Sequence, residues 1–219
     1  MRRYLVIAAV VTLVASLGPQ TVGGQLMSTC VPNSPERQGE IGCSIVERKL
    51  LPTSLREPLF WHIDRFASPL LRRNEDSTAS VAFEAAGTFW LSTIESDTSN
   101  HHGGVHVAVV GPLQLPRVPQ YAVQTQSSLF RPGMYSLVHH HSGVEAVYVI
   151  SGVACFETPA RAFTLRPGET LAVPGETPMR AVVTGVAPRH LLAVIIYDAA
   201  QPPTTRMEEG DKPQLAACK

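Results

Sequence analysis

The most constraining feature of the sequence is a series of short segments between Gly- and Pro-containing turns, which fills residues 86–198. The segments recur every ~8 to 12 residues and carry β-branched or alternating apolar and polar side chains, a pattern typical of strands. No long helical pattern alternates with them, so a parallel α/β sheet is disfavoured. The series therefore predicts an all-β sandwich or barrel. The expected strands are 88–95, 105–110, 121–129, 134–141, 145–150, 153–157, 161–165, 170–173, 179–184 and 191–197.

The residues on either side of this series lack a comparable pattern. Residues 25–85 contain several prolines, and we expect an irregular N-terminal extension that packs on the barrel. One or two short helices are expected there, with residues 80–86 as the best candidate. Residues 199–219 are polar and are expected to form a C-terminal tail.

The first 24 residues have the pattern of a secretory signal. Arg2 and Arg3 precede an uncharged apolar run at 4–17, and Gly24 offers a small residue for cleavage before Gln25. A run of this length is short for a membrane span, which needs ~20 apolar residues. We therefore expect residues 1–24 to be removed on export to the periplasm or the medium, leaving no stable membrane span. An uncleaved N-terminal anchor is the alternative.

The charge balance excludes one class of partner. The chain has 18 Lys and Arg against 18 Asp and Glu, with a sequence pI near 7.1. Nucleic-acid-binding domains normally carry a basic excess that neutralises phosphates, so we expect no nucleic-acid partner. The sequence also lacks the glycine-rich phosphate-binding loops and the nucleophile elbow that would indicate nucleotide binding or hydrolase chemistry.

Four cysteines, all outside the predicted signal, allow two disulfides in an oxidising compartment, with three pairings open. Cys30 and Cys43 bracket a polar loop, and this pairing is favoured. Cys155 with Cys218 would tie the tail to the barrel. The alternative is a buried, apolar Cys155 and a free thiol at Cys218.

Candidate chemistry is concentrated in residues 131–152. In a strand, alternate side chains share a face, so His139 and His141 are expected to point one way and His140 the other. After a tight turn, Glu145 begins a second strand. If its face is also interior, two imidazoles and a carboxylate converge, a donor set that suits Fe(II) and also Mn, Zn, Ni or Cu. The alternative is a His-rich surface turn.

The same alternation predicts which other side chains line the interior. Tyr135 is expected to face inward, where it could donate a proton or line a pocket. The remaining inward positions are apolar: Leu137, Val147, Val149, Ala181 and Val183.

In this region the chain resembles the cupin superfamily. The first motif of that family has a Gly, five residues, His-x-His, three or four residues, Glu, six residues and Gly. Every one of its positions is matched here, by Gly133, His139, His141, Glu145 and Gly152.

The second motif is matched only in part. Gly168 and Pro174 fit it, but Glu176 stands where a glycine is expected, Met179 where the fourth metal-ligating histidine is expected, and Val183 where an asparagine is expected. The resemblance covers residues 131–183 and extends over 86–198. The chain is also similar to small exported bacterial proteins with a single cupin domain.

This resemblance implies a double-stranded β-helix, a jelly-roll barrel, with one divalent transition metal (Fe, Mn, Ni, Zn or Cu) deep inside. His139, His141 and Glu145 would be its ligands. Met179 leaves three interpretations open: three protein ligands plus water, weak ligation by the thioether with a preference for copper, or a site that has lost its metal.

Three classes of function are consistent with such a barrel, because the fold alone does not select one. The favoured class is a metalloenzyme of dioxygenase, isomerase or decarboxylase type that acts on a small organic molecule. The others are a module that binds a small ligand without turnover and a structural cupin. The residues indicate no catalytic group beyond the ligands, and the resemblance implies a homodimer.

Overall fold

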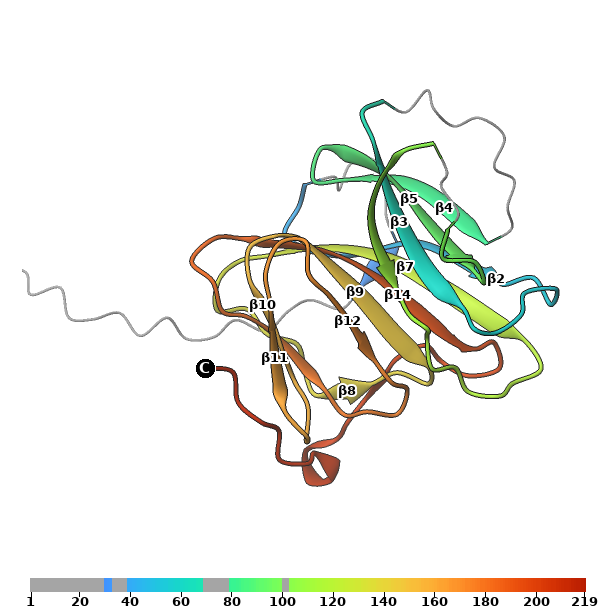
Figure 1. Cartoon of the computed structure of the whole chain (residues 1–219). Coiled ribbons are helices and arrows are strands. Elements are labelled where there is room, and N and C mark those ends of the chain that lie inside the picture. Colours follow the sequence, from blue (N-terminus) through green and yellow to red (C-terminus); the bar gives the residue numbers. More distant parts are fainter. Residues whose placement is uncertain (1–29, 33–38, 69–78, 100–102) are drawn as a thin grey trace, which may run out of the picture.

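The computed structural model describes residues 30–32, 39–68, 79–99 and 103–219, so the predicted signal peptide lies outside the described residues. Within the described ranges, the regular structure consists of fifteen strands and one 3-10 turn, η3 (Glu209–Asp211). The strands form four sheets (Figure 1), which confirms the all-β prediction. No helix in this part of the chain is long and apolar enough to cross a membrane.

The largest sheet has six strands in the order β1-β2-β7-β14-β9-β12. Its central strand, β14, pairs antiparallel with β7 on one side and with β9 on the other. Neighbours on both sides satisfy the backbone of β14, and apolar residues line both of its faces, as expected for a strand buried on both sides. The strands are β1 (Val31–Pro32), β2 (Gly42–Leu50), β7 (Tyr121–Phe130), β9 (Val144–Ser151), β12 (Thr170–Val173) and β14 (Arg189–Asp198).

A second sheet closes the barrel. It contains β11 (Ala162–Leu165), β10 (Ala154–Glu157) and β13 (Arg180–Val183), in that order. A short ribbon of β8 (His139–His140) and β15 (Thr205–Arg206) adds a third piece of wall. The six-stranded and three-stranded sheets share one apolar core, as expected of the predicted double-stranded β-helix. Its buried members are Val147, Val149, Ala154, Phe156, Leu165, Val173, Met179, Leu191 and Ala193.

The N-terminal region is more regular than predicted. It contributes β1 and β2 to the large sheet, and β3 and β4 to a four-stranded antiparallel sheet, β4-β5-β3-β6. The other two strands of that sheet, β5 and β6, were predicted to lie in the barrel and are not part of it. The expected helix at 80–86 is wrong, because β4 pairs along its length with β5. Its alternate residues Val81, Phe83 and Ala85 are buried, which is the period of a strand. The strands are β3 (Phe60–Phe66), β4 (Ser80–Ala85), β5 (Thr88–Glu95) and β6 (Val105–Val110).

This four-stranded sheet packs on the outer face of the six-stranded sheet (Figure 1). The contact joins side chains of both sheets in one apolar cluster, which includes Trp61, Ile63, Phe83, Ile94, Ala146, Leu192, Val194 and Ile196. Strand β9 therefore turns Ala146 toward the added sheet and Glu145 and Val147 toward the barrel interior. Burial on both faces fixes the register of β9, because a slip of one residue would exchange the two sets.

The favoured pairing, Cys30–Cys43, and the second possible pairing, Cys155–Cys218, are both present. Cys30–Cys43 joins β1 to β2 across 13 residues, and Cys155–Cys218 joins β10 to the last residues of the chain across 63. The alternative of a free thiol at Cys218 is therefore wrong. Each end of the described chain is held covalently to the barrel.

The four-stranded sheet contains a buried histidine that makes stability depend on pH. His62 is fully buried, and this burial lowers its pKa, although Glu95, 3.9 Å from its Nε2, opposes the shift. In the unfolded chain a histidine titrates near pH ~6.5. Below that value the unfolded state binds the proton more readily than the folded state, so stability falls as the pH falls.

We therefore expect the free energy of unfolding to drop as the pH is lowered from ~7 to ~5.5, with His62 contributing up to about 1.4 kcal/mol per pH unit. Urea unfolding at several pH values measures this slope. In a His62→Gln variant the slope should be shallower. An unchanged slope would show that other groups, such as His139 and His190, whose pKa values burial also lowers, carry the whole effect.

Candidate metal site

Backbone pairing on both sides holds His139 in place. Its N–H donates to the carbonyl of Met179 at 3.0 Å, and the N–H of Met179 donates back at 2.8 Å. On the other side His139 pairs with Arg206 of β15. Residues directly opposite each other in an antiparallel pair present their side chains on the same face. Met179, at the fourth-ligand position of the motif, is therefore a direct neighbour of His139.

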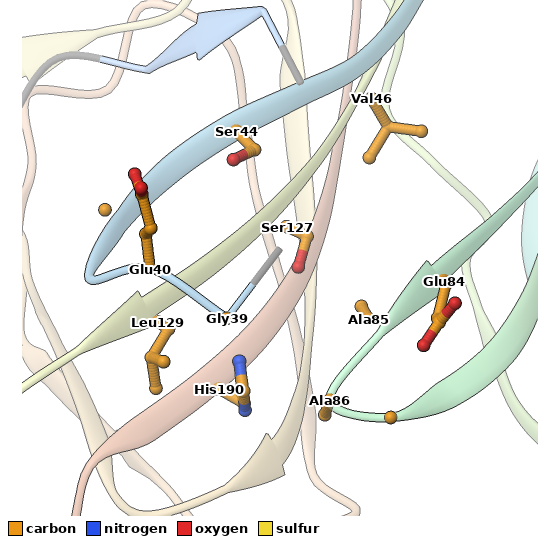
Figure 2. A pocket seen from close by; sticks show the side chains of 12 residues that line it. Gly39, Glu40, Ser44, Val46, Glu84, Ala85, Ala86, Ser127, Leu129 and His190 are labelled. Carbon is orange, nitrogen blue, oxygen red and sulfur yellow. The ribbon is translucent and has the colours of Figure 1, made fainter. Parts of the chain in front are cut away.

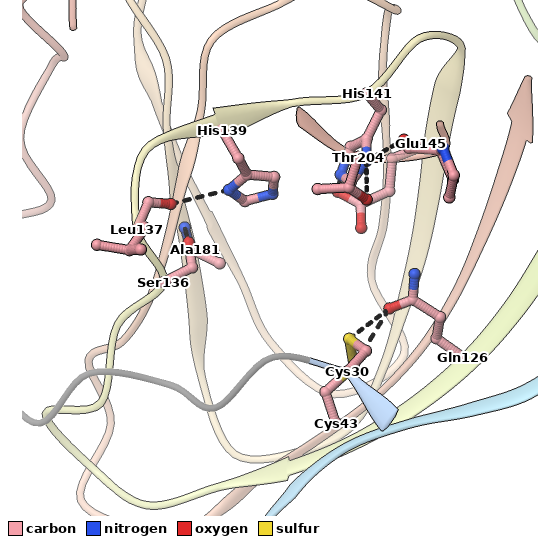
Figure 3. Close-up of polar contacts among 11 residues, drawn as sticks. Cys30, Cys43, Gln126, Ser136, Leu137, His139, His141, Glu145, Ala181 and Thr204 are labelled. Atoms are coloured by element: carbon pink, nitrogen blue, oxygen red, sulfur yellow. Dashed lines mark hydrogen bonds and ion pairs between the residues drawn. A yellow bond between two sulfur atoms is a disulfide. The ribbon is translucent and has the colours of Figure 1, made fainter. Parts of the chain in front are cut away.

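The two predicted histidine ligands are oriented by backbone carbonyls (Figure 3). His139 Nδ1 lies 2.9 Å from the carbonyl oxygen of Leu137, and His141 Nδ1 lies 2.9 Å from that of Pro203. A carbonyl can only accept, so each ring carries its proton on Nδ1 and keeps the lone pair on Nε2. The ring centroids are 4.9 Å apart, with the planes nearly perpendicular. Metal-ligating histidines are typically oriented in this way, with one ring N–H donated to a carbonyl and the other nitrogen left for the metal.

Glu145 completes the predicted set. Its Oε2 lies 3.6 Å from His141 Nε2, which is too long for a hydrogen bond, and neither atom has a hydrogen-bond partner among the described residues. Burial opposes ionisation of Glu145, but attraction to His141 lowers its pKa below the ordinary value. Burial would likewise lower the pKa of His141, yet Glu145 raises it overall. The Glu145 carboxylate, a hydrogen-bond acceptor, thus faces the His141 imidazole inside the protein.

The structure therefore places His141 beside both His139 and Glu145. Within the described ranges, no three His, Cys, Asp or Glu side chains lie close enough in this conformation to hold a metal ion. The chemistry of the donor set still fits one, because two imidazoles with set tautomers and an ionised carboxylate are suitable ligands for transition metals. The two buried atoms without partners, His141 Nε2 and Glu145 Oε2, are the atoms that would bind it.

A glycine brings Glu145 next to His141. A Cβ atom at Gly143 would lie 1.9 Å from the carbonyl oxygen of Ile196 and 2.7 Å from the Cα of Tyr197. The turn between β8 and β9 thus packs directly against the backbone of β14, at a distance that only glycine permits.

Two departures from the second motif have visible structural consequences. Glu176, where a glycine is expected, keeps a left-handed backbone with a φ of 59°. Its N–H donates to the carbonyl of His141 at 2.8 Å, and its carboxylate lies 2.9 Å from His140 Nδ1. His140 is thus paired with Glu176, while the other two histidines approach each other. Met179 is 1% exposed and belongs to the apolar core of the barrel.

The C-terminal segment, predicted to be a polar tail, is part of the site. We call residues 202–207 the strap. Pro203 provides the acceptor for His141 Nδ1, Thr204 Oγ1 lies 3.0 Å from the same nitrogen, and the carbonyl of Pro202 accepts from Ser142 Oγ at 2.7 Å. Residues 205–206 form β15 against β8. The tail prediction missed this role because polar composition does not reveal a long-range strand pairing.

The predicted lining of the barrel interior needs correction. Leu137, expected inside, is 37% exposed. Tyr135 pairs with Val182 through an isolated backbone bridge, and its ring lies 6.0 Å from the guanidinium carbon of Arg180. The expected strand 134–141 is reduced to β8, so alternation cannot be extended back from His139. In addition, the interior wall of β7 and β14 carries polar residues that the sequence analysis did not identify, namely Gln124, Gln126, Ser128 and Arg189, all of them buried.

A separate cavity of about 260 Å³ lies on the other side of the large sheet (Figure 2). It is bounded by β2, β7 and β14 and by the turn between β4 and β5, and His190 lines it. None of the three predicted ligands reaches it. The cavity therefore lies outside the barrel interior.

Comparison with known proteins gives one family match. Residues 128–195 match the family described as "Cupin domain". Similar solved structures include a cupin superfamily protein from Desulfitobacterium hafniense, with 18% identity, 38% of this chain and 83% of that chain covered, and a TM-score of 0.32. No curated protein matches the chain.

Two further structures have enzyme names. The DMSP lyase DddQ from Ruegeria pomeroyi has 19% identity, with 39% of this chain and 43% of that chain covered and a TM-score of 0.35. An oxalate oxidase in complex with the substrate analogue glycolate has 17% identity, with 39% of this chain and 46% of that chain covered and a TM-score of 0.35. The matched region spans less than half of either enzyme.

Proposed function

We propose that this chain, whose residues 128–195 match the cupin-domain family, is an exported metal-binding protein that acts on a small organic molecule. One observation carries the proposal. Backbone carbonyls fix the Nδ1 atoms of His139 and His141, while His141 Nε2 and Glu145 Oε2 are buried, lie 3.6 Å apart and lack hydrogen-bond partners among the described residues. Leaving such atoms unpaired is costly unless something binds them.

In this proposal His139 and His141 bind one divalent transition metal through Nε2, and Glu145 binds it through its carboxylate. Nitrogen and oxygen donors of this kind suit Fe, Mn, Ni, Zn or Cu. A bound ion would supply a Lewis acid at this end of the barrel. The protein's contribution is orientation: the carbonyls of Leu137 and Pro203 set the direction of both rings.

Export is supported by the two disulfides. Disulfides persist in oxidising compartments and are rare in the cytosol. The secretory pattern of residues 1–24 points the same way. We therefore place the mature protein in the periplasm or outside the cell.

Metal-dependent turnover of dioxygenase, isomerase or decarboxylase type is the favoured activity, and capture of a ligand without turnover is the alternative. A structural cupin is favoured by one observation, the burial of Met179 in the apolar core beside His139. A thioether so placed could fill the volume that a fourth ligand would occupy.

Metal content separates the metal-binding candidates from the structural cupin. We expect protein purified from the export compartment to hold one metal ion per chain and the His139→Ala/His141→Ala variant to hold none. His140→Ala is the matched control and should keep the metal, because His140 pairs with Glu176. Elemental analysis measures all three. Wild-type protein that stays metal-free after reconstitution with each candidate ion would contradict the proposal and leave the structural cupin.

A further inference from the structure

Three buried polar side chains share the interior face of the barrel with Glu145. On β7 these are Gln126 and Ser128, and on β14 it is Arg189. The register places Ser128 opposite Leu191, Gln126 opposite Ala193, and Glu145 opposite Ile195, which are alternate residues of β14. Because alternate residues share a face, Gln126, Ser128 and Arg189 extend along the interior wall of the barrel from the candidate metal site.

Arg189 is the unusual member of this set. It is 2% exposed, its Nη2 donates to Ser128 Oγ at 2.9 Å, and its guanidinium lies over the ring of Phe130 at 5.0 Å. The bond to Ser128 directs the side chain along the barrel, toward the end that holds Glu145. Its Nε–H has no hydrogen-bond partner among the described residues. A buried charged donor left unpaired is rare and indicates a missing partner.

The charges in the barrel interior indicate whether that missing partner is an anion or a cation. Burial lowers the pKa of Arg189 to about 10, against the attraction of Glu145, so the guanidinium stays charged at neutral pH. Arg189 and Glu145 cancel each other, and a divalent metal with two neutral histidines would leave an excess of two positive charges. Buried excess charge is costly, and an anion would relieve it.

We propose that the substrate of this barrel is a small carboxylic acid whose carboxylate is bound by Arg189. This inference rests on the proposed metal-binding function. The Nε–H and a neighbouring Nη–H of a guanidinium form a planar fork that matches a carboxylate. Gln126 offers a further polar contact, since Figure 3 shows its amide nitrogen on the side away from the Cys30–Cys43 disulfide and toward Glu145.

The spacing of the two ends limits the size of the acid. Leu191, opposite Ser128, and Ile195, opposite Glu145, are four residues apart on β14, which is ~13 Å at the rise of a strand. The side chains of Arg189 and Glu145 extend into this interval from its two ends. The interval therefore sets an upper limit: an acid with one end at Arg189 and the other at the metal has only a few carbon atoms.

The test is binding of simple carboxylates to the metal-loaded protein. Isothermal titration calorimetry with acetate and malonate, beside the uncharged analogues acetamide and malonamide, measures the preference for charge. We expect the wild type to bind the acids at least 10-fold more tightly than the amides. Arg189→Lys keeps the charge but loses the planar pair of N–H donors, so it should weaken binding of the acids at least 10-fold. Arg189→Met should abolish their binding. His190→Gln, on the opposite face of β14, is the matched control and should bind as the wild type does.

Metal content measured on the same samples separates the two proposals. Stoichiometric metal with acid binding that is unchanged in both Arg189 variants would overturn the carboxylate inference and leave the metal site standing. A wild type that holds no metal would overturn both, because the excess positive charge would not exist. If Arg189→Met does not fold, as judged by circular dichroism, Arg189→Lys alone decides.

Discussion

Replacing Gly143 with alanine is expected to destabilise the protein by about 3 kcal/mol and to abolish metal binding. The added methyl group would lie 1.9 Å from the carbonyl oxygen of Ile196 and 2.7 Å from the Cα of Tyr197. Both atoms belong to the backbone of β14, which pairs with β7 and β9 and cannot move without breaking those ladders. The turn at 141–143 must move instead, and we expect this movement to separate His141 from Glu145.

Urea unfolding and metal content together measure this effect. Gly210→Ala is a suitable control, because nothing lies within 4 Å of a Cβ at that position and its backbone is not left-handed. It should unfold at the urea concentration of the wild type and keep its metal. A Gly143→Ala variant that behaves in the same way would show that the turn relaxes freely, and that its contact with β14 does not position Glu145.

The closeness of His139, His141 and Glu145 in space could be predicted because they are close together in the chain. Two histidines separated by one residue share a face of any extended segment, and the short turn at 141–143 returns Glu145 to the same end of the barrel. The structure agrees in bringing His141 and Glu145 to 3.6 Å. The same reasoning failed at Leu137, because alternation holds only while the strand continues, and β8 has two residues.

Long-range contacts account for what the sequence did not reveal. Arg189 is the first residue of β14, ahead of the apolar run 191–196, and nothing local distinguishes it from a surface residue at a strand end. Only the register of β14 against β7 places it beside Ser128. Pro203 reaches His141 from 62 residues away. Strand β3 was missed for a related reason, since it is flanked by prolines and its pairing partners β5 and β6 lie far along the chain.

Deleting residues 202–219 should have the other large effect, because it removes both the strap and the second disulfide. Cys155–Cys218 closes a loop of 63 residues, which on the chain-entropy model stabilises the fold by about 4 kcal/mol. The deletion also takes away the Pro203 carbonyl that fixes the proton of His141 on Nδ1. Loss of such a partner typically weakens metal binding by about 10- to 100-fold. Urea unfolding and competition with a chelator measure the two effects separately.

A Cys155→Ala/Cys218→Ala variant distinguishes the covalent link from the strap. It loses the loop closure but keeps Pro203, Thr204 and the pairing of β15 with β8, so its stability should fall while its metal affinity stays within a factor of a few of the wild type. If the deletion and the double cysteine variant bind metal equally well, the carbonyl of Pro203 does not orient His141. If both lose affinity to the same extent, the disulfide holds the strap in place, and the strap's hydrogen bonds alone do not.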